Sequence, residues 1–101
     1  MFLERGRVSR KTPKDGKLEI TDSAAARVCT LPTRFTIVVN GDHGVGSLDT
    51  MSCTCRGADH AHTHHFLRSE LLKRLPVDSD VSVDLLEDAA TVVIANARTD
   101  C

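Results

Sequence analysis

Three short segments place the strongest limit on what this chain can fold into, because each has the pattern of a β-strand. They cover residues 34–40 (RFTIVVN), 81–87 (VSVDLLE) and 91–97 (TVVIANA). Branched apolar residues dominate them, and such residues favour strands because they pack well on a pleated surface. Only a few residues separate the last two segments, so together they predict a hairpin.

Further strands are predicted in the rest of the sequence. Two candidates lie near residues 4–10 and 17–20, on either side of a turn at 11–17 (KTPKDGK) that contains a proline and a glycine. Residues 46–55 (GSLDTMSCTC) alternate in polarity, and residues 62–66 (HTHHF) are expected to pair with them beyond a loop. The chain is therefore expected to consist largely of consecutive strands.

Helix is expected in one clear place. Residues 66–75 (FLRSELLKRL) carry four leucines at the spacing of one helical face, and Pro76 follows them. These leucines are Leu67, Leu71, Leu72 and Leu75. A single helical turn is also expected in residues 21–29 (TDSAAARVC), with Asp22 or Ser23 as the N-cap. Three glycines in residues 40–46 (NGDHGVG) predict a turn.

The number of strands and the shortage of crossover helices predict the fold class. We expect a mainly β (α+β) protein, a small antiparallel barrel or pseudobarrel of six or seven strands with one short helix. Its 101 residues suit a single small barrel domain over residues 1–101. The chain has only three phenylalanines, so Val, Leu, Ile and Ala must fill most of the core.

Charge is distributed unevenly along the sequence. Residues 1–20 hold six basic and three acidic side chains, whereas residues 76–101 hold one basic and six acidic side chains. A basic end can contact a phosphate backbone or an acidic partner, and it can equally be a solvated arm. The basic residues of this end are Arg5, Arg7, Arg10, Lys11, Lys14 and Lys17.

Residues 53–66 (CTCRGADHAHTHHF) concentrate cysteine and histidine. If residues 46–55 pair with 62–66 so that Cys55 faces His62 and Cys53 faces His64, all four side chains share one face. Thiolate and imidazole are the ligands of structural zinc sites. A Zn²⁺ site is therefore a hypothesis for Cys53, Cys55, His60, His62 and His64, while His65 points to the other face. The alternative is that the cysteines are small core residues and the histidines lie on a surface hairpin.

No sequence motif of a known catalytic centre is present, so no catalytic residue is assigned and an enzyme is not the expected class. The first ten residues (MFLERGRVSR) carry charges and lack the apolar stretch of a secretory signal. No apolar run is long enough for a membrane span. A cytoplasmic protein without a membrane partner is therefore expected.

The order of elements from residue 34 to residue 96 resembles one family. A strand that ends in a turn, a second strand with a polar loop, a short helix and a closing hairpin are similar to the B3-like pseudobarrel. This domain recognises DNA in plant transcription factors and in certain restriction endonucleases. The resemblance implies that loops on one side of the barrel grip double-stranded DNA while basic side chains hold phosphates. The candidates for this phosphate-binding role are Arg5, Arg7, Arg10, Lys11 and Lys14, with Arg56 in the later loop.

The function expected from the sequence is therefore non-enzymatic nucleic-acid binding, to double-stranded DNA, as a recognition module or as a small subunit of a larger system. The alternative is a zinc-stabilised module that binds a protein partner or has a structural role and does not bind nucleic acid. A salt series separates them, because phosphate binding weakens steeply as salt rises.

Overall fold

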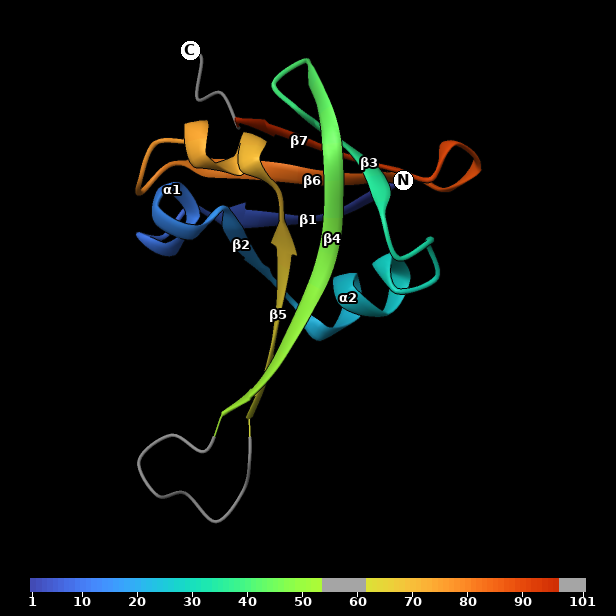
Figure 1. Ribbon diagram of the computed structural model, residues 1–101, viewed down its shortest axis with the longest axis horizontal. Helices are drawn as coiled ribbons and strands as arrows, with labels where there is room; N and C mark the ends of the chain where they lie inside the picture. Colours follow the sequence, from blue (N-terminus) through green and yellow to red (C-terminus); the bar gives the residue numbers. More distant parts are fainter. Residues whose placement is uncertain (54–61, 97–101) are drawn as a thin grey trace.

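Seven strands form the framework of the protein, as a computed structural model shows for residues 1–53 and 62–96 (Figure 1). The strands are β1 (Phe2–Arg7), β2 (Lys17–Ile20), β3 (Phe35–Val39), β4 (Asp42–Cys53), β5 (His62–Arg68), β6 (Asp80–Leu86) and β7 (Thr91–Asn96). Two α-helices, α1 (Lys11–Asp15) and α2 (Asp22–Val28), and two 3₁₀ helices, η2 (Glu70–Arg74) and η3 (Glu87–Ala89), connect them. The prediction of a mainly β, barrel-like fold is confirmed.

The strands follow the order β1-β6-β7-β3-β4-β5-β2 in one curved sheet that is nearly closed. The long strand β4 joins its two halves, because residues 42–46 pair with β3 and residues 47–53 pair with β5. The edge strands β1 and β2 lie next to each other. The Glu4 carboxylate helps to close this seam by accepting hydrogen bonds from the backbone N–H of Thr21, at 3.1 Å, and from its hydroxyl group.

One strand pair differs from the antiparallel arrangement that was expected. β3 and β7 are parallel, with Thr36 opposite Thr91 and Val39 opposite Ile94. The side chains of Asn40 and Asn96 tie the ends of these two strands together, because the Asn40 amide donates to Asn96 Oδ1 at 2.7 Å. The long connection from β3 through β4 and β5 to β7 makes the parallel pairing possible.

The core follows from the alternation of residues along the strands. The side chains that point inward from β3, β6 and β7 are fully or almost fully buried, and β2, β5 and α2 add others. The buried residues of β3, β6 and β7 are Phe35, Ile37, Val39, Val81, Val83, Leu85, Val92 and Ile94. As the composition indicated, aliphatic side chains fill most of the core, and Phe35 is the one phenylalanine in it.

The helix expected over residues 66–75 is not formed. Strand β5 continues to Arg68, Ser69 is extended with φ −167° and ψ 146°, and only a 3₁₀ helix follows. Leu72 and Leu75 are buried as expected, whereas Leu71 is only partly buried. The leucine spacing fits this arrangement as well, because Leu67 reaches the core from a strand and the later leucines reach it from a tight turn.

Two turn predictions are also corrected. The segment expected to be a turn forms the short helix α1, which ends at Gly16 in the left-handed conformation. The turn expected over residues 40–46 is shorter, because Asn40 and Gly41 alone link β3 to β4. Both have positive φ, as a tight hairpin turn requires. The N-cap of α2 is Thr21, whose side chain accepts from Ala24 N at 3.2 Å.

Among residues 1–53 and 62–96, none of the helices has the length and apolar character needed to cross a membrane.

Candidate nucleic-acid interface

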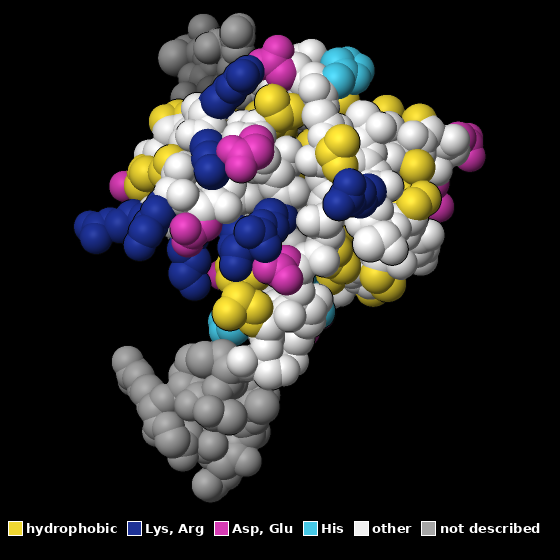
Figure 2. All heavy atoms as spheres, in the orientation of Figure 1, with side chains coloured by type: hydrophobic (Ala, Val, Ile, Leu, Met, Phe, Trp, Pro, Cys, Tyr) yellow, Lys and Arg dark blue, Asp and Glu magenta, His cyan; other side chains and the backbone are white. Residues whose placement is uncertain are grey.

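A basic groove lies where α1, β2, the end of β5 and η2 meet. Four basic side chains line it, together with two acidic side chains and two serines, and its volume is about 590 Å³. The basic residues are Lys14, Lys17, Arg68 and Lys73; the others are Asp15, Glu70, Ser47 and Ser69. Figure 2 shows Lys and Arg side chains gathered on this side of the molecule, with acidic side chains between them.

Phe66 supports part of this surface. It is 3% exposed but does not belong to the main core, since alternation along β5 places Leu67 inside the barrel and Phe66 on the outer face. The ammonium groups of Lys11 and Lys17 lie 5.3 Å and 5.7 Å from the centroid of its ring. Both lysines therefore cover the ring with their chains and keep their charges at a fixed place on the surface.

Ion pairs hold several groove residues in place. Lys17 and Arg68 share the Asp49 carboxylate, at 3.4 Å and 3.9 Å from Oδ2, and Lys73 lies 3.0 Å from Glu70. The exposed Lys73–Glu70 pair is of a kind that contributes about 0–1 kcal/mol, so a phosphate can replace that carboxylate at little cost, whereas the Lys17–Asp49 pair is partly buried. The cations of the groove can thus exchange contacts with the protein's own carboxylates for contacts with the phosphates of a bound molecule.

The structure places most of the predicted phosphate-binding residues on two neighbouring elements. Arg5 and Arg7 are exposed on β1, across the seam from β2. Arg10, Lys11 and Lys14 are exposed at the beginning of α1 and along it, and Lys14 lines the groove. The sixth candidate, Arg56, lies outside the described residues.

Three basic residues of the groove were not among the predicted ones: Lys17, Arg68 and Lys73. Lys17 belongs to the basic stretch of residues 1–20, whereas Arg68 and Lys73 follow much later in the sequence, so no local charge pattern joins these two to it. Only the pairing of Lys17 with Arg68 in the β2–β5 ladder brings the first two together. Only a correct prediction of the β2–β5 pairing could have shown that Lys17 and Arg68 lie side by side.

The register expected for the cysteine–histidine hairpin is wrong by two residues. Cys53 faces His62 and Met51 faces His64 in the β4–β5 ladder, whereas the predicted register paired Cys53 with His64. The observed register places Leu48 opposite Leu67, which lets both pack against the core. A shift of two residues leaves every side chain on the same face of the sheet. The packing of Leu48 and Leu67 against the core therefore decides between the two registers.

The five candidate zinc ligands are only partly covered by the structure. Cys53 and His62 are directly opposite in the ladder, and Cys55 and His60 lie outside the described residues. The fifth, His64, uses its Nδ1 to contact Glu19 Oε2 at 2.9 Å. Within the described part of the chain, no group of three or more potential ligands is close enough to hold a metal ion.

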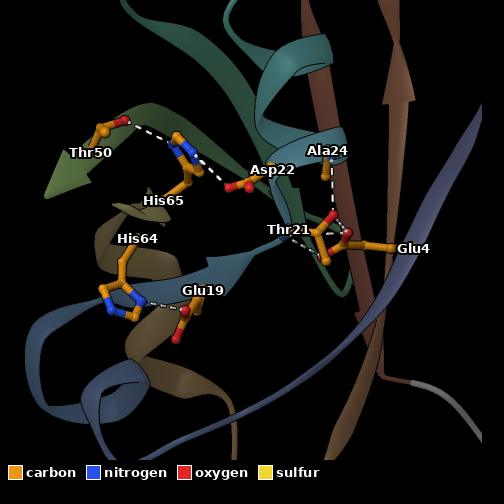
Figure 3. Close-up of polar contacts among 8 residues, drawn as sticks. All are labelled: Glu4, Glu19, Thr21, Asp22, Ala24, Thr50, His64 and His65. Carbon is orange, nitrogen blue, oxygen red and sulfur yellow. Dashed lines mark hydrogen bonds and ion pairs between the residues drawn. The ribbon is translucent and has the colours of Figure 1, made fainter. Parts of the chain in front are cut away.

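The two neighbouring histidines of β5 point to opposite faces, as expected (Figure 3). His64 lies on the outer face beside Glu19, with its ring stacked at 6.3 Å from the ring of Phe66. His65 contacts Thr50 and Asp22 instead.

No known protein-family model matches the sequence, and a comparison with curated proteins finds no similar protein.

Proposed function

We propose that the protein binds double-stranded nucleic acid through its basic groove, as a recognition module or as a small subunit of a larger system. The observation that carries the proposal is the convergence of Lys14, Lys17, Arg68 and Lys73 from four separate elements. Cations on a shallow surface neutralise phosphates, and such contacts supply most of the affinity for nucleic acid irrespective of its sequence.

The exposed face of α1 and β1 extends this surface. Arg10 and Lys11 lie beside the groove on α1, and the exposed side chains of Arg5 and Arg7 lie across the seam on β1. A duplex can therefore contact basic side chains on both sides of the seam. The position of these residues supports the double-stranded DNA partner that the B3-like resemblance implies.

The phenylalanines support a duplex rather than a single strand. Binding of single strands relies on exposed aromatic rings on which bases stack. Phe35 and Phe66 are buried, and Phe66 is covered by lysine side chains. Phe2 is exposed, but it lines a different pocket from the basic groove. Phosphate contact, not stacking, is the mode of binding that this surface offers.

The experiment is a titration of a fluorescent DNA duplex, followed by anisotropy over a salt series. The double variant Lys14→Gln/Arg68→Gln removes two exposed groove cations. We expect the slope of log K against log salt to become shallower by about 2, because each phosphate contact contributes about 0.9. The control is Arg27→Gln/Arg34→Gln, which removes the same charge from exposed residues outside the groove.

Two results would overturn the proposal. The first is no binding of the parent protein to the duplex at about 50 mM salt, where phosphate contacts are strong. The second is an equal loss of affinity in both double variants, which would mean that net charge matters and the groove does not. Far-UV circular dichroism of each variant verifies that it is folded.

One observation favours the second function, a zinc-stabilised module for a protein partner. The β4–β5 ladder pairs the backbone of Cys53 directly with that of His62, two residues of ligand type. Zinc content of the purified protein, with melting curves in the presence and absence of a chelator, tests this function. Less than one zinc per chain and a melting curve that zinc does not shift would exclude it.

A further inference from the structure

Three side chains from different elements form a chain of polar contacts at the middle of β5 (Figure 3). The Oγ1 atom of Thr50, in β4, lies 3.0 Å from Nδ1 of His65. The Nε2 atom of the same imidazole lies 3.1 Å from Oδ1 of Asp22, the first residue of α2. Both ring nitrogens are thus engaged, one by a hydroxyl group and the other by a carboxylate.

The backbone explains how the three residues meet. Thr50 and His65 are directly opposite in the β4–β5 ladder, so their side chains share a face. His65 also faces Ile20, the last residue of β2, and the chain turns at Thr21 so that α2 begins beside the imidazole. This contact set therefore depends on the ladder and on the helix start, both of which are regular parts of the fold.

The contacts favour one arrangement of the protons. Nε2 of His65 lies beside the Asp22 carboxylate at ion-pair distance, and a carboxylate only accepts, so the hydrogen of the neutral imidazole is assigned to Nε2. Nδ1 then has a free electron pair, which can accept a hydrogen bond from the Thr50 hydroxyl. A hydroxyl, a basic nitrogen and an orienting carboxylate in this order are the parts of an activated nucleophile.

The three side chains differ in accessibility, and that of Asp22 is 87% exposed. The His65 side chain is only 19% exposed, which holds the imidazole in one orientation. Thr50 is exposed, so a substrate can reach its oxygen atom. Little protein surrounds that oxygen, so the site cannot assist the reaction by burying the substrate. The substrate must therefore carry a good leaving group.

We propose that Thr50 is a nucleophile that accepts an acyl group from an activated ester, with His65 as general base and Asp22 as a positioning residue. Thr50 Oγ1 forms a bond to the carbonyl carbon while its proton passes to Nδ1 of His65. The bond between that carbon and the leaving oxygen then breaks, and the leaving oxygen takes the proton from His65. The products are an ester on Thr50 and a free alcohol or phenol.

The test is incubation of the whole protein with p-nitrophenyl acetate, followed by release of p-nitrophenol and by peptide mapping. We expect one acetyl group on Thr50 that alkaline hydroxylamine removes, as it removes esters but not amides. Thr50→Val should abolish acetylation of the peptide, and Thr50→Ser should retain it.

His65→Gln should lower the rate by about 10²-fold or more, the usual contribution of a general base. Asp22→Asn should lower it less, because the imidazole remains but loses its orienting charge. The control is His43→Gln, which changes an exposed histidine of β4, the strand that carries Thr50. The proposal is overturned if acetyl groups appear only on lysine or cysteine, or if the His65 and His43 variants react at equal rates.

Discussion

Gly16 occupies a position where a single methyl group should be costly. It ends α1 with φ 70° and ψ 35°, and its carbonyl accepts a hydrogen bond from Ser69 N at 2.9 Å. A Cβ atom added to Gly16 would lie 2.6 Å from the carbonyl oxygen of Ser69. That oxygen belongs to the backbone and cannot rotate away, so the junction between β5 and η2 must move.

Two separate costs contribute to the expected effect of Gly16→Ala. The left-handed conformation costs a residue with a Cβ about 1–2 kcal/mol. Forcing an extra carbon into a packed site costs about 1–3 kcal/mol more. The free energy of unfolding should therefore fall by about 2–5 kcal/mol, a large part of the stability of a domain of this size.

Gly41 provides a matched control for this prediction. It also has a positive φ, 91°, but a Cβ added there meets no heavy atom within 4 Å. Gly41→Ala should therefore lose only the conformational part, about 1–2 kcal/mol. The assay is urea unfolding followed by far-UV circular dichroism, since the chain has no tryptophan or tyrosine for fluorescence. Equal losses in the two variants, within about 0.5 kcal/mol, would refute the contact with Ser69.

Two further predictions concern the same end of the barrel. Leu72→Ala should lower the free energy of unfolding by about 2–5 kcal/mol, because Leu72 is fully buried. Leu71→Ala should cost less than half as much, because Leu71 is only partly buried. Equal losses of the two variants in urea unfolding would contradict the 3₁₀ geometry. Thr12→Val should raise stability by about 1 kcal/mol, because the Thr12 hydroxyl is buried without a hydrogen-bond partner among the described residues. A lower melting temperature for Thr12→Val would show that the hydroxyl group has a partner.

The strands could be predicted from sequence because their alternation matches their burial. In β6 the residues Val81, Val83 and Leu85 are buried and the intervening ones are not fully so. β3 shows the same alternation of burial, whereas in β7 Thr91 and Val92 are both buried. β3 and β7 were predicted from their branched apolar residues, which favour strands. Where the local sequence and the tertiary environment favour the same strand conformation, as in these three segments, the strand predicted from sequence is correct.

The segment after β5 shows where such a prediction fails. Four leucines at helical spacing indicated a helix, but the backbone of Phe66, Leu67 and Arg68 pairs with both β2 and β4. These ladder hydrogen bonds decide the conformation, and Ser69 then caps a 3₁₀ turn by accepting from Leu71 N at 3.3 Å. Tertiary pairing overrides the local preference, and a single sequence does not reveal it.

The candidate sites depend on the pairing of strands even more than the conformation of the segment after β5 does. Lys14 belongs to a basic stretch that is visible in the sequence, whereas Arg68 and Lys73 join it only through the contacts of β5 and η2 with β2 and α1. The contact between His65 and Asp22 joins residues of β5 and α2 that no spacing rule connects. Residue types alone indicated phosphate binding, but the groove itself required the fold.

The Gly16–Ser69 hydrogen bond connects stability with the proposed function. It fixes α1 against η2, and these elements carry Lys14 and Lys73, which lie on the two sides of the basic groove. Gly16→Ala must move one element away from the other and so change the spacing of these two cations. At a temperature where both glycine variants are folded, Gly16→Ala should bind a DNA duplex more weakly than Gly41→Ala, with a shallower salt slope. Equal affinities would show that the spacing across the groove does not matter for binding, and phosphate contacts would then have to come from the exposed arginines of β1.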